Sequence, residues 1–276
     1  MVSRSGRPRA LPVLLFLPLW LAGCAPAALG ELPAGAAFRA AFSEQGVAWV
    51  SSGRACVARA PSFRPECPPL PAAIDVAWNG PDVWAGVPGL GVVVTLDGAA
   101  RTVNVGRVAA LSAGRVYRED GSAVTYAGEP VRGVVGRPSA AVTVGGAEFA
   151  LVGGEVRRVA DGVVLARGAA FLAVTTGGAA GSAQPQLVTA EGTYRLTGER
   201  LERLDPAGRV VAAAPHGPGR LGRVGALIVT VDVAGTVRAF SVDLIRTRIE
   251  GAAKPLQSER MPVGEKRVPG VELAIR

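Results

Sequence analysis

Short apolar runs that stop at glycine recur along most of this chain, and they constrain its fold more than any other sequence feature. Residues 92–96 (VVVTL) precede an Asp-Gly pair at 97–98, and residues 155–159 (EVRRV) precede another at 161–162. Aspartate and glycine adopt the positive φ values of tight hairpin turns at low cost, so each run is expected to be a β-strand. The 37 glycines would each cost about 1 kcal/mol inside a helix, which favours an all-β fold. The best helix candidate, residues 36–43, is short and fits a leading strand equally well.

The expected strands fall into similar units. Residues 108–136 and 140–168 each contain four of them in roughly 30 residues, with a small first strand, a hydrophobic second strand and more polar outer strands. In a propeller blade the inner strands crowd around an axis and the outer strands meet water, so this order predicts blades. Further units span 74–106, 170–214 and 223–250, while 46–59 is a partial unit. The total predicts a β-propeller of roughly five to six blades.

Two segments differ from these units. Residues 177–186 are rich in glycine, alanine, serine and glutamine, and they predict a loop inserted into the unit at 170–214. Residues 271–275 (VELAI) alternate in hydropathy. We expect them to complete the partial first unit as a ring-closing strand.

The layout of residues 46–250 resembles that of the broad group of WD40-like and quinoprotein-like β-propellers. The resemblance lies in the order of the strands. No Trp-Asp dipeptide of the WD40 type is present, and Trp49, Trp78 and Trp84 all lie in the first third of the chain, so no cofactor is carried over from either group. A β-sandwich and an irregular β-solenoid also contain short alternating strands, and they are the alternative folds.

The N-terminal residues have the three-part layout of an export signal. Arginines at positions 4, 7 and 9 precede the apolar stretch 11–20, and small residues then lead into Cys24. A helix that crosses a membrane needs about 20 apolar residues, whereas this stretch is shorter and contains prolines at 12 and 18. A cleaved signal is therefore favoured over a transmembrane helix.

The tetrad at 21–24, Leu-Ala-Gly-Cys, resembles the lipobox of bacterial lipoprotein precursors. The resemblance implies cleavage between Gly23 and Cys24 and acylation of Cys24, which would hold the protein permanently at a membrane. Ala25 provides no aspartate retention signal, so the outer membrane or the cell surface is favoured over the inner membrane. The expected domains are a signal peptide (1–23), a flexible tether (24–37), a propeller domain (38–250) and a tail (251–276) that ends in the closing strand.

Cys56 and Cys67 form an even pair once Cys24 is assigned to lipid. Disulfides persist in compartments outside the cytosol, and the proline-containing segment between the two cysteines is expected to be an irregular loop. We therefore predict a disulfide between Cys56 and Cys67. Closing so short a loop is worth roughly 3 kcal/mol in the chain-entropy model.

No catalytic or metal-binding motif stands out. His216 is the only histidine, and the prolines and glycines around it explain the shape of its loop. One histidine does not supply a zinc or transition-metal site, and the chain has neither a Gly-x-Ser-x-Gly elbow nor a phosphate loop. A propeller glycosidase would need two carboxylates in its central funnel. The acids considered for that role are Asp75, Asp82, Asp97, Glu148, Glu155 and Asp243.

Charge gives little support to nucleic acid as a partner. The formal net charge is +8, but this value includes the three signal arginines, and no run of consecutive basic residues marks a phosphate-binding patch. No nucleic-acid partner is expected, and no metal or cofactor is expected either.

The leading functional hypothesis is a non-catalytic, lipid-anchored propeller that serves as a scaffold or interaction module for another envelope protein. Trp78 and Trp84 flank a turn-rich segment at 79–82, which is considered as an interaction loop, although burial of both rings between blades is the favoured interpretation. Two other hypotheses remain. One is a protein that binds an envelope glycan or small ligand in a site lined by arginine and aromatic residues, and the other is a carboxylate-dependent, glycosidase-like enzyme.

Overall fold

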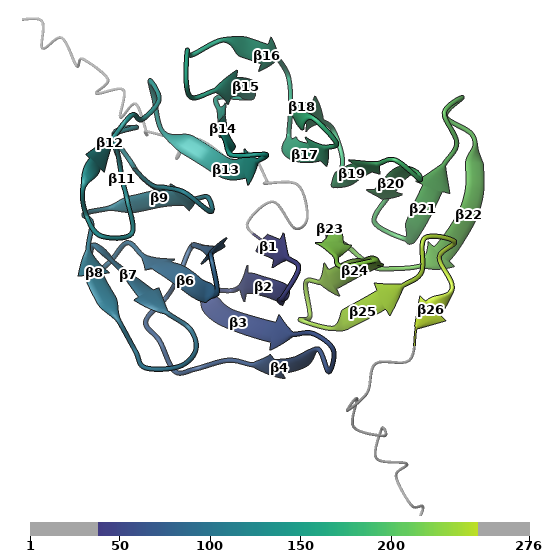
Figure 1. Ribbon diagram of the computed structural model, residues 1–276, viewed down its shortest axis with the longest axis horizontal. Coiled ribbons are helices and arrows are strands. Elements are labelled where there is room, and N and C mark those ends of the chain that lie inside the picture. Colours follow the sequence, from purple (N-terminus) through teal and green to yellow (C-terminus); the bar gives the residue numbers. More distant parts are fainter. Residues whose placement is uncertain (1–37, 248–276) are drawn as a thin grey trace, which may run out of the picture. The chain divides into compact units, whose positions relative to one another are not determined.

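The computed structural model describes residues 38–247, all of which belong to one compact unit of the chain. These residues form 26 strands, which make six sheets that follow one another around a ring (Figure 1). Each sheet is a blade of a β-propeller, so the predicted all-β propeller is confirmed, with six blades. The described residues include no helix long and apolar enough to cross a membrane.

Each blade is built from one continuous segment. Blade 1 comprises β1 (Arg39–Ser43), β2 (Gly46–Ser51), β3 (Arg54–Arg59) and β4 (Arg64–Glu66). Blade 2 comprises β5 (Asp75–Asn79), β6 (Asp82–Val87), β7 (Val92–Thr95) and β8 (Thr102–Asn104). Blade 3 comprises β9 (Val108–Leu111), β10 (Val116–Arg118), β11 (Ala123–Val124) and β12 (Pro130–Val131).

The remaining blades follow the same order along the chain. Blade 4 comprises β13 (Pro138–Val144), β14 (Ala147–Val152), β15 (Glu155–Arg158) and β16 (Val164–Ala166). Blade 5 comprises β17 (Phe171–Thr175), β18 (Gly178–Ser182), β19 (Gln186–Thr189), β20 (Gly192–Leu196), β21 (Arg200–Leu204) and β22 (Val210–Pro215). Blade 6 comprises β23 (Gly219–Val224), β24 (Leu227–Asp232), β25 (Val237–Phe240) and β26 (Arg246–Thr247).

The second strands of the blades carry much of the core. In β2, β6, β14 and β24, five of the six residues are buried. A strand that faces a neighbouring blade on both sides buries both sets of alternating side chains, which explains its continuous apolar sequence. One cluster contains Val47 and Trp49 from blade 1 together with Val229 and Val231 from blade 6. The core therefore lies between neighbouring blades.

Blade 5 contains two more strands than the other blades, and it corrects the loop predicted at 177–186. Within that segment, β18 pairs with β17, and β17 runs parallel to β19. The small residues that suggested a loop are needed for close packing against blade 4. A Cβ atom on Gly178 would lie 3.2 Å from the Phe149 ring of β14, and one on Gly181 would lie 2.9 Å from the Ala166 Cβ of β16.

The ring closes where β1 packs beside β23. A Cβ atom on Gly222 of β23 would lie 2.2 Å from the Phe42 ring of β1, so glycine permits this close approach. Blade 1 has all four strands rather than the partial unit expected at 46–59, because part of the helix candidate at 36–43 forms β1. The ring-closing strand predicted at 271–275 lies outside the described residues.

A disulfide joins Cys56 on β3 to Cys67 just after β4, with a Cα–Cα distance of 4.1 Å, and this confirms the predicted pair. Cys56 is buried beside Trp49 in the cluster between blades 1 and 6. The disulfide therefore fastens the outer strand of blade 1 to the core.

Candidate functional site

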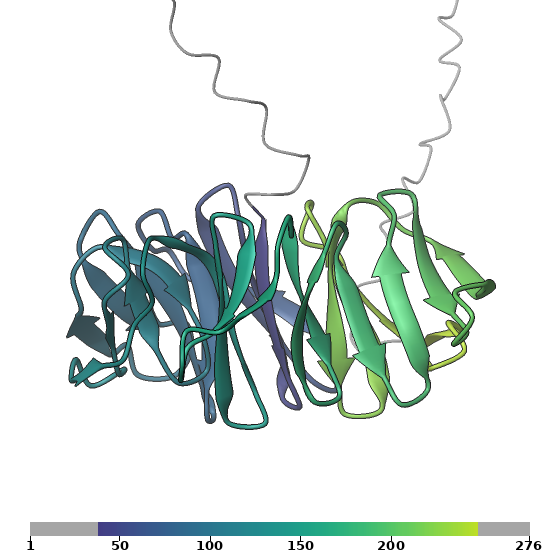
Figure 2. The same ribbon diagram turned by 90° about the horizontal axis from the view of Figure 1, so that it is seen from above.

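Blades 1 to 4 each connect their first two strands by a short turn. We call the turns at 44–45, 80–81, 112–115 and 145–146 the rim loops. Three of them contain two residues, since strand pairing extends to Ser43–Gly46, Asn79–Asp82 and Val144–Ala147. Two-residue hairpin loops allow few backbone conformations. In the side view, turns of this kind lie at the two ends of the strands (Figure 2).

Hydrogen bonds connect the rim loops, or strand residues close to them, from one blade to the next. They run from Gln45 Nε2 to the Gly80 carbonyl (3.4 Å), from Asn79 Nδ2 to the Ala113 carbonyl (2.6 Å), and from the Gly114 amide to Thr143 Oγ1 (3.2 Å). Four blades are thereby linked in series. The rim loops are held in one arrangement in the unbound protein, which reduces the entropy that a binding partner would have to remove.

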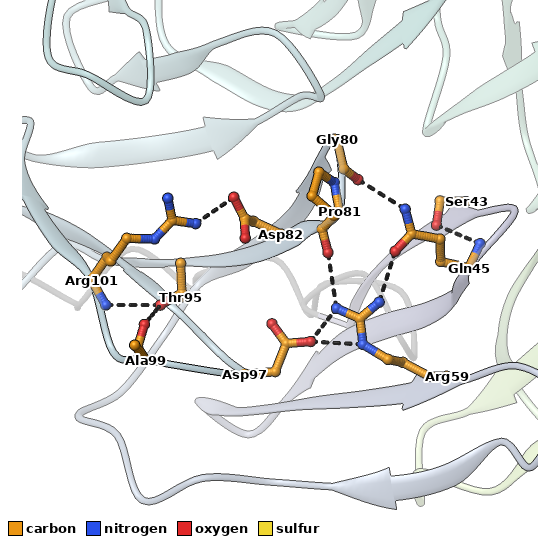
Figure 3. A network of polar contacts seen from close by, with 10 residues as sticks. All are labelled: Ser43, Gln45, Arg59, Gly80, Pro81, Asp82, Thr95, Asp97, Ala99 and Arg101. Atoms are coloured by element: carbon orange, nitrogen blue, oxygen red, sulfur yellow. Dashed lines mark hydrogen bonds and ion pairs between the residues drawn. The ribbon is translucent and has the colours of Figure 1, made fainter.

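Arg59, at the end of β3, holds two rim loops together (Figure 3). Its Nη1 donates to Gln45 Oε1 (2.8 Å), and its Nη2 donates to the Pro81 carbonyl (2.9 Å). Its Nε donates to Asp97 Oδ2 at 2.8 Å, and the guanidinium carbon lies 5.0 Å from the centre of the Trp78 ring. The planar guanidinium group offers five donors and a face for stacking, so one side chain makes all these contacts.

Arg101 makes similar contacts within blade 2. It forms an ion pair with Asp82, and its guanidinium carbon lies 5.2 Å from the centre of the Trp84 ring. Its amide donates to Thr95 Oγ1 (2.9 Å), which fixes the turn after β7 (Figure 3). The β5–β6 hairpin turn is therefore supported at Pro81 and Asp82 by two arginines, each of which lies over an indole ring.

The structure places both predicted contact aromatics in the core. Trp78 and Trp84 are 5% and 3% exposed. Trp78 Nε1 donates to the Ala41 carbonyl (3.1 Å), and the centre of the Trp84 ring lies 5.3 Å from that of Tyr126. Both indoles are therefore buried, as the sequence favoured, and they do not form a contact surface, because β5 and β6 face neighbouring blades and bury their large apolar side chains. The turn at 80–81 is exposed.

Four of the six candidate acids take part in ion pairs. The pairs are Asp82 with Arg101, Asp97 with Arg59, Glu155 with Arg157 and Arg167, and Asp243 with Arg203. The other two acids, Asp75 on β5 and Glu148 on β14, are 6% and 7% exposed. Glu148 accepts hydrogen bonds from the hydroxyls of Tyr117 (3.2 Å) and Thr143 (2.6 Å), so it ties β14 to β10 and β13.

Asp75 links the first strands of blades 2 and 3. Its carboxylate accepts hydrogen bonds from the amides of Val76 (2.9 Å) and Leu111 (2.8 Å). Burial raises the pKa of Asp75 to about 6, while Arg39 and the two amides act in the opposite direction. These bonds give Asp75 a structural role between the two blades.

Arginine and phenylalanine side chains gather on the first strands near Asp75. Arg39 begins β1, and Arg220 lies on β23. The Arg220 guanidinium carbon lies 4.8 Å from the centre of the Phe171 ring and 5.9 Å from that of Phe38. Burial, together with the positive charge of Arg39, lowers the pKa of Arg220 to about 10.

His216 is a buried structural residue, 4% exposed. Its Nδ1 lies 2.6 Å from the Gly217 carbonyl, and its Nε2 lies 2.7 Å from Thr230 Oγ1. Because a carbonyl accepts only, we assign the proton to Nδ1, and Nε2 then accepts from the threonine hydroxyl. Burial lowers the pKa of His216, which favours the neutral ring.

Gly23 and Cys24 lie outside the described residues. Within 38–247, no group of three or more His, Cys, Asp and Glu side chains is arranged to hold a metal ion. Arg59 and Arg220 were not singled out from the sequence, because arginine is frequent throughout the chain. Their contacts with residues in other blades distinguish them, and these contacts follow from the fold.

Comparison with known proteins agrees with this fold. No protein-family model matches the sequence, and no curated protein matches it. The structure is similar to PorZ, described as an essential bacterial surface component of the type-IX secretion system of Porphyromonas gingivalis, with a TM-score of 0.50, 11% identity, and coverage of 76% of this chain and 37% of that one. It is also similar to BamB from Moraxella catarrhalis, with a TM-score of 0.43, 14% identity, and coverage of 71% of this chain and 82% of that one. The WD40 propeller domain of Doa1 gives a TM-score of 0.41, 12% identity, and coverage of 76% of this chain and 80% of that one. The likeness to PorZ concerns the fold alone, and the six blades themselves define the class as a β-propeller.

Proposed function

We propose that this protein is a lipid-anchored, non-catalytic β-propeller of the bacterial cell envelope whose rim loops bind another envelope protein. The observation that carries the proposal is the series of hydrogen bonds that connects the rim loops of blades 1 to 4. A surface that is ordered before binding loses little conformational entropy on association. Exposed glycines such as Gly80 and Gly145 also let a partner approach the backbone closely.

An envelope location is supported by two observations. The disulfide between Cys56 and Cys67 is of a kind that persists outside the cytosol. PorZ, which has a similar fold, is described as a bacterial surface component of a secretion system. The outer membrane or the cell surface is the location proposed here.

Anchoring is proposed to occur through acylated Cys24 after removal of residues 1–23. The Cys24→Ala variant is expected to accumulate as an uncleaved or mislocalised precursor with an unaltered β body. Intact-mass measurement of the membrane fraction should show acyl chains on Cys24 in the wild type. Unchanged processing and membrane attachment of Cys24→Ala would overturn this part of the proposal.

Site-specific photo-cross-linking in intact cells tests the rim-loop surface. A photoreactive residue replaces Glu44, Pro81 or Ala113, all of which are exposed on rim loops. The control position is Leu90, which is 63% exposed and lies in the β6–β7 turn at the opposite end of blade 2. We expect one discrete adduct from the three rim positions and none from the control. Equal adducts from the rim and the control, or no adduct from the rim, would contradict the proposal.

Binding of an anionic glycan or small ligand near Asp75 is a second candidate function. The arginine and phenylalanine cluster favours it, since the guanidinium of Arg220 is positioned by two aromatic rings. Calorimetric titration with an acidic oligosaccharide should show binding that Arg220→Gln removes. The matched control is Arg223→Gln, at an exposed position on the same strand. No binding by the wild type, or equal binding by the two variants, would exclude this function.

A further inference from the structure

The outer edge of blade 5 differs from that of every other blade described. Its outer strand, β22, contains six residues, whereas β4, β8, β12, β16 and β26 contain two or three. The strand order of the sheet ends at β22, so no strand within residues 38–247 pairs with its outer edge (Figure 1). An edge strand of this length presents a row of backbone donors and acceptors to the surroundings.

Natural proteins protect such edges by keeping them short or by placing charges and prolines on them. Several outer strands of this propeller follow that rule. Strand β4 reads Arg-Pro-Glu, β12 begins with Pro130, and β26 contains Arg246. Strand β22 reads Val-Val-Ala-Ala-Ala-Pro, with no charge and with proline at its last position. It is longer than the other outer strands and lacks the charges of β4 and β26, and its regular part runs from Ala212 to Pro215, after a register shift at Val211.

The side chains of β22 divide into a packed set and an exposed set. Ala212 and Ala214 pack against the core cluster between blades 5 and 6. Val211 and Ala213 are exposed, and 54% of the Val211 surface is accessible. The backbone pairs with β21 from Val210 to Pro215, with a register shift that leaves Val211 without a partner residue on β21. The result is an ordered edge with small apolar side chains beside it.

An exposed arginine lies at each end of this edge, and one of them directly follows the exposed Glu199. Arg209 directly precedes β22, and its side chain is 80% exposed although it pairs with Asp205. Arg200 is exposed on β21 directly opposite Pro215, at the other end of the strand. Acidic residues at the two ends of an incoming segment would complement these arginines.

We propose that the outer edge of β22 binds an extended segment of a partner protein, which adds to blade 5 as a further strand. Backbone hydrogen bonds would hold the segment, and contact with Val211 and Ala213 would select small apolar side chains in it. Pairing of two six-residue edges from two copies of this chain would bury far less than the roughly 1,000 Å² that a stable interface needs, which favours a segment over a second copy. This docking site is separate from the rim loops and does not depend on their proposed function.

Hydrogen exchange of the full mature chain with a synthetic peptide tests the proposal. The probe is a capped peptide that alternates valine and threonine between terminal aspartates. Saturating peptide is expected to slow exchange of the amides in β22 by about tenfold, as strand addition requires. Val211→Lys places a charge on the edge and should weaken binding at least about tenfold. The matched control, Leu165→Lys, alters the exposed outer strand of blade 4 and should bind as the wild type does.

Peptide methylated on alternate backbone nitrogens should not bind, because it has lost the donors that pair with β22. Ala213→Lys provides a second edge variant, and melting curves establish that each variant is folded. Absence of protection at about 1 mM peptide, or equal binding to wild type and both edge variants, would overturn the proposal. Protection without peptide that grows with protein concentration would assign the edge to a second copy and also overturn it. Protection without peptide that disappears when residues 251–276 are removed would assign the edge to the protein's own tail, with the same consequence.

Discussion

Arg59 on β3 forms an ion pair with Asp97 in the turn after β7, and this pair joins blade 1 to blade 2 across 38 positions of sequence. The same guanidinium donates to the side chain of Gln45 and to the carbonyl of Pro81. Asp97 therefore fixes the orientation of the arginine that holds two rim loops. From the sequence, Asp97 was considered as a turn residue or a candidate catalytic acid, whereas in the structure it positions Arg59.

Replacement of Asp97 is expected to make the rim loop at 80–81 more mobile while it lowers the stability of the whole protein only slightly. Partly exposed ion pairs contribute roughly 0–1 kcal/mol, so Asp97→Asn should lower the free energy of unfolding by about that amount. Without the carboxylate, Arg59 loses the contact that orients it, and the amides of 79–82 should exchange faster. Urea unfolding and hydrogen exchange measure the two effects. The control is Asp161→Asn, which removes an ion pair within blade 4 and should leave the exchange rates of the amides at 79–82 unchanged. Unaltered exchange of these amides in Asp97→Asn would contradict the positioning role of Asp97.

The contact between β1 and β23 predicts a strong effect at Gly222. The Gly222→Ala variant would place its Cβ atom 2.2 Å from the Phe42 ring, so strands at the ring closure must move apart. Overpacking of this kind costs about 1–3 kcal/mol, and Tm should fall accordingly. Gly177→Ala is the control, since its Cβ atom would meet nothing within 4 Å. If Gly222→Ala and Gly177→Ala had the same Tm, the described packing between blades 1 and 6 would be wrong.

Loss of the disulfide should destabilise blade 1. The double variant Cys56→Ala/Cys67→Ala is expected to lose roughly 2–4 kcal/mol of the free energy of unfolding, because the reduced chain regains conformational freedom when it unfolds. Denaturant unfolding of the purified mature chain, with and without a reducing agent, measures the change. The reducing agent should shift the wild type and leave the double variant unaffected. Two titratable thiols in the untreated mature protein would contradict the assignment.

His216 should make the stability of the protein depend on pH between neutral and mildly acid conditions. Its pKa in the folded protein is lowered below the usual 6.5, chiefly by burial. As pH falls through 6.5 the unfolded chain binds the proton first, so this contribution to stability is present above pH 6.5 and is lost on acidification. Asp75 acts in the opposite sense, because its pKa is raised from 3.8 to about 6 and the folded state takes up the proton first.

The difference between wild type and His216→Gln isolates the histidine. Glutamine keeps a hydrogen-bonding side chain but does not titrate, so the stability lost by the wild type between pH 7 and pH 5 should be smaller in the variant. Thermal unfolding at several pH values provides the comparison. An identical pH dependence in both proteins would show that His216 is not held in its neutral form.

The blade pattern could be predicted from the sequence because it depends on local signals. Turns such as those at 97–98 and 161–162 mark where strands such as β7 and β15 end, and the buried second strands follow from their continuous apolar residues. The hairpin β17–β18 could not be predicted, since its glycines and alanines resemble a loop until the neighbouring blade that requires them is known.

The site was less predictable than the fold for a similar reason. Two tryptophans, Trp78 and Trp84, flank a turn-rich segment and so allow an exposed aromatic loop, but packing on both sides of blade 2 buries the rings. The functions proposed for Arg59 and for the β22 edge depend on contacts between blades or on the absence of a neighbouring strand in the described part of the chain. Such relationships arise from the tertiary structure, and no short motif encodes them.

The most direct test of rim-loop binding is the yield of the photo-cross-link from position 81 in cells that carry Asn79→Ala. Asn79 donates the 2.6 Å hydrogen bond that links the rim loops of blades 2 and 3, whereas Asn104→Ala removes an exposed asparagine from β8 and serves as the control. If the ordered rim is what the partner recognises, the yield should fall at least about threefold in Asn79→Ala and stay at the wild-type level in Asn104→Ala. Equal yields in the two variants, at equal protein levels, would contradict the proposed function.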